Sequence, residues 1–559
     1  MDKKRLNALL LVTFMFSVFM LWDAWERAHK PPPAPEPEAA ANAVPGAPAA
    51  AAPAVPAVTA TPAATVPAAN VPKVAVHTDL YKAEISAQGG DLVFLELEKH
   101  RATLDAGKNF VLFQNDSQQH VYIGQSGLIG EGLPNHKTTF SPEKSDYTLA
   151  EGQDSLSVRL TAPAANGLKV AKIYTFKRGS YLIDVSYEIT NTGNAAVTPY
   201  GYFQTVRDGK DAEAHNHGLF GVTTFTGPAV YTQAEHYQKV KFVDVDKSKA
   251  SYAHKADNGW IGMVQHYFFT AWLPQGKAER EFYIDRLDTS LYRAGVKFAL
   301  PVVEPGKTVR VDVPLYAGPQ EQDKLESIAP GLDRVVDYGW LTIIASPLFW
   351  IMEKLHSMIG NWGWTIIALT VMLKLIFFPL SAASYRSMAK MKAVMPQMTR
   401  LKESYKDDRA KLNVEMMELY KREKINPLGG CLPVLVQIPV FIALYWVLLG
   451  TVEMRGAPWL GWITDLTAAD TLFGVIPYVN LPLGPLPLLM GATMFFQTRL
   501  NPTPPDPMQA KIMTWMPVFF TFMFLSFPAG LVLYWTVNNI LSIAQQWYIT
   551  KQMERATAK

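Results

Sequence analysis

Cysteine is nearly missing from this chain of 559 residues, in which Cys431 stands alone. An intramolecular disulfide is therefore excluded, and each folded domain must be stable without a covalent crosslink. An excess of charge of one sign is also lacking, because 52 Lys and Arg and 49 Asp and Glu leave a formal net charge of +3. No uniform electrostatic field therefore indicates nucleic acid as the main partner. Hydrophobic residues, by contrast, make up 49% of the sequence and are unevenly distributed, so part of the apolar surface can face lipid.

Residues 1–25 predict a transmembrane anchor. A basic start at Lys3, Lys4 and Arg5 precedes an uncharged apolar run that, at about 17 residues, is near the lower limit for a spanning helix. A cleaved signal peptide is the alternative, but Asp, Trp, Glu and Arg follow the run where small residues are needed, which favours an uncleaved anchor. The basic start places the N-terminus in the cytoplasm. Residues 26–72, rich in Pro and Ala, predict an extended linker.

Residues 73–330 predict a large antiparallel β-sandwich. Short runs such as 155–160 and 181–187 alternate apolar and polar residues, as half-buried strands do. Turn-forming residues separate such runs at 177–180 and 191–194. The sequence therefore predicts a separate β-domain between the linker and the apolar C-terminal half.

A carbohydrate-active enzyme is one rival interpretation of such a sandwich. We find no carboxylate pair on matching strands, which acid and base chemistry on a sugar would need. His215 and His217 could lie on one face of a strand as metal ligands, yet no third ligand can be identified. We therefore predict no enzyme activity, no catalytic residue, no metal and no cofactor.

After residue 330 the apolar period becomes helical. Residues 331–360 predict an amphipathic helix in the outer interface of the membrane, and an ordinary helix packed under the sandwich is the alternative. With the anchor, hydropathy predicts about six spans. The five further spans are 361–383, 431–452, 483–499, 511–527 and 529–550.

Charge predicts the topology of these spans. The segment 384–430 holds about eleven Lys and Arg against about six Asp and Glu, an excess typical of short cytoplasmic loops. This places 384–430, the loop 500–510 and the tail 551–559 in the cytoplasm. The β-domain and the loop 453–482 are then periplasmic, so we predict a multi-pass protein of the inner membrane with both termini inside.

Lys374 is the only ionisable residue between Trp362 and Leu380. A rise of 1.5 Å per residue places it about 18 Å below the outer interface, past the midplane of a hydrocarbon core of about 30 Å. A lysine that faces lipid there is costly, so the ammonium should face a protein interior or a wet cavity, with Thr370 on the same helical face. The alternative is that Lys374 snorkels to the inner surface.

Uncharged polar residues accompany Lys374 in the other predicted spans. Asn538, Ser542 and Gln545 recur at i, i+4 and i+7 and give the last span a polar face. Hydrogen bonding between helices is the alternative for any one of them. Together with Lys374 they predict a hydrated groove. The other polar residues of these spans are Gln437, Gln497, Thr536, Asn539 and Gln546.

The segment 384–430 predicts a helical hairpin with a turn at Asp407 and Asp408. Its apolar stripe could contact varied apolar segments of substrates, although packing of one helix on the other is the more common use of such a stripe. The basic residues of the hairpin could meet anionic lipid or ribosomal RNA, or only set the topology. The stripe consists of Met388, Met391, Met395, Met398 and Leu401, followed by Leu412, Met416, Leu419 and Tyr420.

Three longer motifs resemble the YidC/Oxa/Alb family of insertases. They are Asn-Pro-Leu-Gly-Gly-Cys-Leu-Pro at 426–433 leading into Gln-Ile-Pro at 437–439, Asp-Pro-Met at 506–508, and Phe-Pro-Ala-Gly-Leu at 527–531 before Tyr534. Motifs of this length are more specific than a lone glycine fingerprint. The similarity covers about residues 337–550, while the anchor, linker and β-domain are similar to the Gram-negative form of the family.

The resemblance implies a five-helix core around a groove that is open to the cytoplasm and to lipid. It also implies that the hairpin receives substrates, that Lys374 is the basic residue of the groove, and that Tyr534, Trp535 and Thr370 contact substrates. Relatives often carry arginine where this chain has Lys374, and lysine lacks the planar fork that bidentate contacts need.

Residues and resemblance together predict a membrane protein insertase and chaperone that performs no covalent chemistry. The implied partners are nascent membrane proteins, the Sec translocon with its accessory subunits, the ribosome and membrane lipids, with no DNA. A transporter is the second rival, but it should show internal repeats and several ionisable residues within the membrane, and Lys374 alone qualifies.

Overall fold

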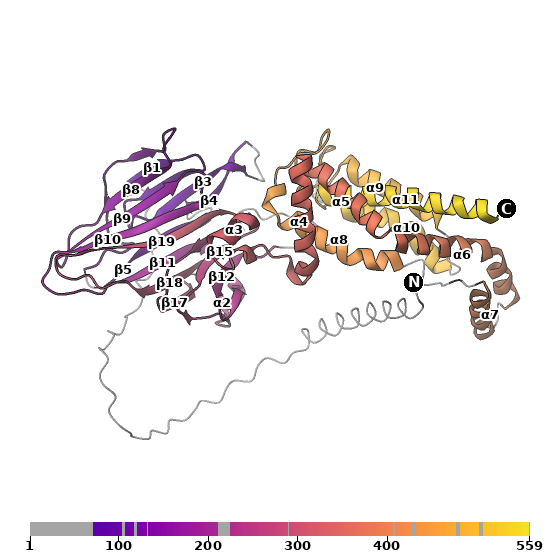
Figure 1. Cartoon of the computed structure of the whole chain (residues 1–559), viewed down its shortest axis with the longest axis horizontal. Coiled ribbons are helices and arrows are strands. Elements are labelled where there is room, and N and C mark those ends of the chain that lie inside the picture. Colours follow the sequence, from indigo (N-terminus) through magenta and orange to yellow (C-terminus); the bar gives the residue numbers. More distant parts are fainter. Residues whose placement is uncertain are drawn as a thin grey trace, which may run out of the picture. The chain divides into compact units, whose positions relative to one another are not determined.

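The structure is a computed structural model that describes residues 71–102, 107–116, 120–130, 132–210, 224–288, 290–405, 408–423, 425, 432–476, 481–501 and 507–557. The predicted anchor and nearly all of the predicted linker lie outside these residues, as do His215, His217 and Cys431. The described residues up to 319 fold mainly as strands, and helices predominate after residue 341 (Figure 1). The predicted fold class, a β-sandwich followed by a helical core, is confirmed.

The sandwich consists of one sheet of ten strands and one of nine among the described residues. The first sheet contains, in spatial order, β14 (Lys255–Ala256), β17 (Arg280–Arg286), β18 (Leu291–Ala299), β11 (Tyr200–Asp208), β5 (His120–Ile129), β4 (Asn109–Asp116), β3 (Leu92–Arg101), β2 (Tyr81–Ser86), β1 (Lys73–His77) and β7 (Asp146–Thr148). The second contains β13 (His236–Lys239), β12 (Gly227–Thr232), β15 (Trp260–Val264), β16 (Phe268–Trp272), β19 (Thr308–Pro319), β10 (Leu182–Asn191), β9 (Leu168–Lys177), β8 (Ser155–Thr161) and β6 (Ser141–Pro142). The strand pairs are antiparallel except β1 with β7, which run parallel.

Strand β10 shows why the alternating pattern specifies this architecture. Ile183 and Val185 are buried in the core between the sheets, whereas Asp184 and Glu188 lie on the outer face. There Asp184 forms an ion pair with Lys177 on the neighbouring β9 at 2.6 Å. A register slip of one residue would expose the apolar side chains and bury the charged ones, so the sequence holds the strand in this register.

A charged pair, Asp91 and Lys172, lies inside the sandwich with both side chains fully buried. The Nζ atom of Lys172 is 3.8 Å from Oδ1 of Asp91 and donates to the carbonyl oxygens of Gly89 and Ser126 at 3.1 and 3.2 Å. The Nε2 atom of Gln125 donates to Oδ2 of Asp91 at 2.8 Å. Burial raises the pKa of Asp91 and lowers the pKa of Lys172, while their mutual attraction opposes both shifts.

The remaining elements connect the sandwich to the helical core and build that core. The connecting and loop elements are α2 (Phe242–Asp246), α3 (Gln322–Ile328), η1 (Leu332–Val335), η2 (Gly339–Leu341), η4 (Val452–Met454), β20 (Val475–Ile476) and β21 (Leu481–Pro482). The core contains α4 (Thr342–Ile359), α5 (Trp362–Ile376), α6 (Phe378–Ser404), α7 (Arg409–Arg422), α8 (Leu432–Gly450), α9 (Pro485–Leu500), α10 (Pro507–Phe524) and α11 (Ala529–Thr557). Within the described residues, no single helix has both the length and the apolar composition to cross a membrane, but α5 and α6 taken together do, with a bend of 66° between them.

The break between α5 and α6 falls at Phe377. Helix α5 begins after Asn361, whose side chain accepts a hydrogen bond from the backbone N–H of Trp364 at 3.2 Å. Helix α6 begins with Pro379 in its first turn, where the missing N–H group leaves no hydrogen bond unmade. Lys374 therefore lies in the last turn of α5, directly before the chain changes direction.

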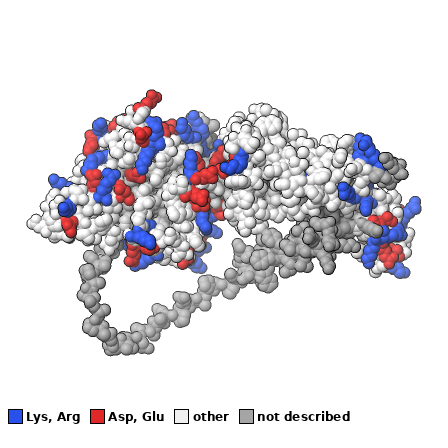
Figure 2. All heavy atoms as spheres, in the orientation of Figure 1, with Lys and Arg blue, Asp and Glu red and all other residues white. Residues whose placement is uncertain are grey.

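The core helices leave large apolar side chains on the surface. Helix α4 packs on α5 and α8 and buries Leu348, Phe349 and Met352, but Ile343 is 86% exposed. Lys, Arg, Asp and Glu are spread over the β-domain and the end of the hairpin, whereas the visible face of the other core helices carries few (Figure 2). Such a surface needs an apolar partner. Exposed examples are Trp350, Trp364, Leu375, Phe496, Trp515, Phe519 and Tyr548.

Glu453 in η4 is half-buried, and the Oε2 atom of its carboxylate is buried with no hydrogen-bond partner among the described residues. Burial, reinforced by the nearby carboxylates of Glu321 and Glu353, raises the pKa of Glu453 to about 8. The unfolded chain loses this proton near pH 4.5, so between about pH 4.5 and 8 the folded protein holds a proton that the unfolded chain does not. This carboxyl should therefore make the fold less stable as the pH rises, by up to about 1.4 kcal/mol per pH unit.

We expect Glu453→Gln to remove this pH dependence, because the amide stays neutral at every pH. The midpoint of thermal unfolding of the full chain in detergent, measured at pH 5 and pH 8, should rise at pH 8 relative to the parent and change little at pH 5. The exposed Glu326→Gln is the matched control. An equal difference between pH 5 and pH 8 in the parent and in Glu453→Gln would contradict the assignment.

Candidate functional site

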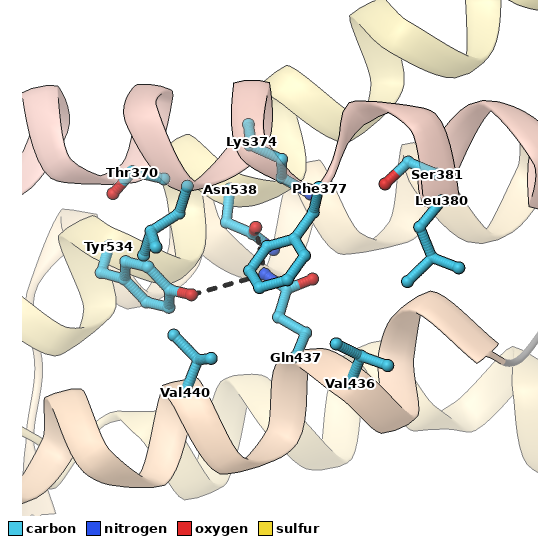
Figure 3. A pocket seen from close by; sticks show the side chains of 11 residues that line it. Thr370, Lys374, Phe377, Leu380, Ser381, Val436, Gln437, Val440, Tyr534 and Asn538 are labelled. Carbon is cyan, nitrogen blue, oxygen red and sulfur yellow. Dashed lines mark hydrogen bonds between the residues drawn. The ribbon is translucent and has the colours of Figure 1, made fainter. Parts of the chain in front are cut away.

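A cavity lies between α5, the start of α6, α8 and α11 (Figure 3). Helices α5 and α11 provide its polar wall, and α8 provides a mainly apolar wall with one glutamine. The cavity is thus polar on one side and apolar on the other. Its lining residues are Thr370, Leu373, Lys374, Phe377, Leu380, Ser381, Val436, Gln437, Val440, Tyr534 and Asn538.

Lys374 is the charged residue of this cavity, and its side chain is 9% exposed. Its Nζ atom donates to Oγ of Ser542 on α11 at 2.7 Å, and that hydroxyl in turn donates to the carbonyl oxygen of Asn538 at 2.7 Å. In the part of the chain that the structure describes, no carboxylate forms an ion pair with Lys374. The ammonium is thus buried against a neutral partner, and no carboxylate of the described residues neutralises it.

Gln437 connects α8 to α11 across the cavity. Its Nε2 atom donates to Oδ1 of Asn538 and lies 3.4 Å from the hydroxyl oxygen of Tyr534 (Figure 3). Tyr534 is 2% exposed, and its ring stacks on Phe441 at 6.2 Å between centroids. Thr370 also lines the cavity, although its hydroxyl donates to the carbonyl oxygen of Ile366 one turn earlier.

The other predicted polar residues of α11 hold helices together. Asn539 donates to Oγ1 of Thr493 on α9 at 3.2 Å, and Gln546 donates to Oδ1 of Asn501 at 3.2 Å. Gln545 reaches the backbone carbonyl of Lys374 at 3.5 Å. The last helix therefore divides its polar side chains between the cavity and hydrogen bonds to other helices, and for Asn539 the second use is the alternative given for the polar pattern.

The predicted aromatic pair Tyr534 and Trp535 is separated by the structure. Tyr534 lines the cavity, whereas Trp535 packs among Phe441, Phe520 and Phe524, with the Phe441 centroid at 4.5 Å. Consecutive residues on a helix point about 100° apart, so two neighbours cannot both face one narrow cavity.

Several residues that line the cavity were not predicted from the sequence. Ser381 lies seven residues after Lys374, but the bend at Phe377 removes the simple helical spacing that would have related the two. Leu373, Leu380, Val436 and Val440 are apolar and carry no signal that separates a cavity wall from an ordinary packing contact.

The methionine stripe of the predicted hairpin packs mainly within the hairpin. Met398 is 1% exposed and joins a cluster with Val394, Leu419 and Ile425, against which Met391, Met395 and Leu401 are partly buried. Met388 instead packs against a cluster of Ala382, Tyr385 and Ile549 at the base of α6. Most of the stripe thus packs one helix of the hairpin on the other, which is the more common use of such a pattern. The apolar side chains that α7 exposes are Val414 and Met417.

A metal centre has no support within the described ranges, where no group of three or more His, Cys, Asp or Glu side chains is arranged to hold an ion. The buried carboxylate of Asp91 and the half-buried Glu453 lie in other parts of the chain from the Lys374 cavity. What the cavity offers is a single cation, amide and hydroxyl groups, and an apolar wall. With a volume of about 20 Å³, the cavity has room for about one water molecule, so in this structure these groups can hydrogen-bond one small polar group.

Comparisons with known proteins identify the family. Residues 73–351 match the family described as YidC periplasmic domain, and residues 354–556 match the family described as 60Kd inner membrane protein. The "Membrane protein insertase YidC" of Aromatoleum aromaticum is 57% identical over 563 residues, which cover 99% of this chain and 98% of the relative. The protein of the same name from Dechloromonas aromatica is 53% identical, with 99% of this chain and 98% of the relative covered.

A solved structure described as an active YidC insertase with its first transmembrane domain resolved is 19% identical, covers 86% of this chain and 93% of its own, and has a TM-score of 0.40. The curated relatives carry the assignment, since their identity exceeds 50% over nearly the whole length. The resemblance predicted from the motifs is confirmed, and the chain belongs to the YidC family of inner-membrane protein insertases.

Proposed function

We propose that this protein inserts and helps fold integral membrane proteins by receiving their polar or acidic flanks in the cavity at Lys374. The observation that carries the proposal is the ammonium of Lys374, buried against a serine hydroxyl without a carboxylate partner among the described residues. A buried charge that is hydrogen-bonded but not neutralised keeps much of its desolvation cost. An acidic group of an incoming segment would supply the missing countercharge.

The polar wall and the apolar wall of the cavity would contact different parts of a client during insertion. The polar flank of a client would contact Thr370, Lys374 and Asn538, while its apolar helix would follow the α8 wall at Val436 and Val440. Outside the cavity, α5 and α11 also carry exposed apolar side chains, for example Leu375, which is 67% exposed, and Ile540, which is 47% exposed. A polar flank would thus cross a shorter apolar distance, and the membrane potential would assist an acidic one.

The topology and the partners follow from the charge pattern and the family resemblance. We place both termini and the hairpin α6–α7 in the cytoplasm and the β-domain in the periplasm. Nascent chains would arrive at the hairpin from a ribosome, and the protein would act alone or beside the Sec translocon. The exposed apolar surface of the core would contact membrane lipids.

Lys374→Met should reduce the insertion of a short single-span substrate with an acidic tail by about tenfold, the effect of losing about 1.4 kcal/mol of charge attraction. The same substrate with its acidic residues replaced by Asn and Gln should insert with nearly equal efficiency in the parent and the variant. Lys374→Arg should keep most of the insertion, because the charge remains. The measurement is protease protection of the tail after depletion of the chromosomal protein.

Lys390→Met, which removes an exposed lysine of α6, is the matched control and should insert both substrates normally. A photocrosslinker should capture the arrested tail from position 534, which lines the cavity, more efficiently than from position 535, which packs against α8 and α10. If Lys374→Met inserted the acidic substrate as efficiently as the parent does, the charge of Lys374 would have no part in the mechanism.

A further inference from the structure

A second cavity, of about 370 Å³, lies between α6, the end of α9 and the C-terminal part of α11. It shares no lining residue with the cavity at Lys374. Tyr385 and Met388 form an apolar part of its wall, and Leu500 closes it on the α9 side. The remaining lining residues are Ala389, Lys392, Gln546, Trp547, Thr550, Lys551 and Glu554.

The charges of this cavity favour an anion. Lys392 and Lys551 contribute two positive charges and Glu554 one negative charge, so the lining carries a formal net charge of +1. The Nζ atom of Lys551 lies 4.7 Å from the ring centroid of Trp547, an arrangement that holds the ammonium beside the aromatic ring. Two lysines on different helices can approach one phosphate group from two sides.

Gln546 offers a ligand a hydrogen-bond acceptor, its side-chain oxygen Oε1. Its Nε2 atom donates to Asn501, which fixes the amide, and its Oε1 atom is buried without a partner within the described part of the chain. The side chain is 5% exposed, so water reaches it poorly. A buried amide oxygen without a partner is costly, and a hydroxyl group of a bound molecule would satisfy it.

The surroundings of the cavity favour a lipid over a soluble anion. Trp547 and Tyr548 are 57% and 58% exposed, as aromatic residues at a membrane interface are. Phe496, one turn before Leu500 on the same face of α9, is 63% exposed and offers an apolar path for acyl chains that leave the cavity. Under the proposed topology, on which this inference rests, this end of the bundle lies at the cytoplasmic leaflet.

We infer that this cavity binds the headgroup of an anionic glycerophospholipid that carries a free hydroxyl, of the phosphatidylglycerol type. The phosphate lies between Lys392 and Lys551, and a glycerol hydroxyl donates to Oε1 of Gln546. The bound lipid then bridges α6 to α11.

The test is lipid retention by the full chain in detergent, measured by native mass spectrometry with phospholipids of identical acyl chains. The parent should retain phosphatidylglycerol about tenfold more than phosphatidylcholine, and Lys392→Gln with Lys551→Gln should abolish that preference. Both lysines are exposed, so their loss leaves the fold intact. The matched control is Lys402→Gln with Lys411→Gln on the hairpin, which should retain the preference.

Phosphatidylmethanol, which has the same singly charged phosphate diester but no headgroup hydroxyl, distinguishes simple charge attraction from the inferred site. It should be retained less than phosphatidylglycerol by the parent and equally by Gln546→Met. Equal retention of phosphatidylglycerol and phosphatidylcholine by the parent, or an undiminished preference in the double lysine variant, would overturn the inference. Lys374→Met should keep the lipid preference, so failure of the proposed insertion mechanism would be seen separately.

Discussion

Lys172→Met is expected to lower the free energy of unfolding of the full chain by about 3–5 kcal/mol. The substitution keeps the volume of the side chain but leaves the carboxyl of Asp91 without its cation in a fully buried position. The carbonyl oxygens of Gly89 and Ser126 lose a donor at the same time. Denaturant unfolding in detergent, followed by tryptophan fluorescence of the β-domain, would measure the change.

Lys177→Met on the same strand, β9, provides the matched control. Lys177 pairs with Asp184 at 2.6 Å, but its side chain is 53% exposed, so loss of this pair should cost no more than about 1 kcal/mol. Lys172→Met combined with Asp91→Asn should regain part of the lost stability, because the amide carries no charge to bury. If both lysine variants lose the same small amount, the buried pair does not have the stabilising role that its burial indicates.

Gly259→Ala is expected to destabilise the fold by more than about 3 kcal/mol, or to prevent the chain from accumulating. Gly259 has φ +99°, and an added Cβ would lie 2.0 Å from the carbonyl oxygen of Tyr231. That oxygen belongs to the backbone of β12, which is paired with β15, so no side-chain rotation can relieve the overlap. The yield of folded protein and the midpoint of thermal unfolding in detergent are the measurements.

Gly276→Ala separates backbone strain from steric overlap. Gly276 has φ +73° with no atom within 4 Å of an added Cβ, and its carbonyl, like that of Gly259, accepts a hydrogen bond from Arg280. The strain of a left-handed residue alone should cost about 1 kcal/mol. Equal losses in the two alanine variants would mean that the contact with Tyr231 is not what requires glycine at 259.

The candidate site was predicted in part because its chemistry is visible along the chain. A lysine within an apolar helix must find a polar environment, so Lys374 by itself predicted a protein interior or a wet cavity around its ammonium, with snorkelling as the alternative. The polar spacing of 538, 542 and 545 predicted a polar face on the last span near Lys374, and the hydrogen bond from Lys374 to Ser542 agrees with that pattern. Which of the polar residues on α11 face the cavity and which face α9 depends on the rotation of the helix, and spacing alone does not specify it.

The sequence by itself predicted the fold class, the family and the place of Lys374 within an apolar helix. Apolar periods of two and of 3.6 residues reflect which face of each element is buried, and the long motifs are specific enough to identify the family. Contacts between segments distant in the chain were decided only by the tertiary structure. The pairing of Asp91 with Lys172, the meeting of Gln437 with Tyr534 and Asn538, and the cavity beside Lys551 each join elements whose approach depends on packing. Local periodicity indicates which residues of an element are buried, but it does not indicate which other element packs against them.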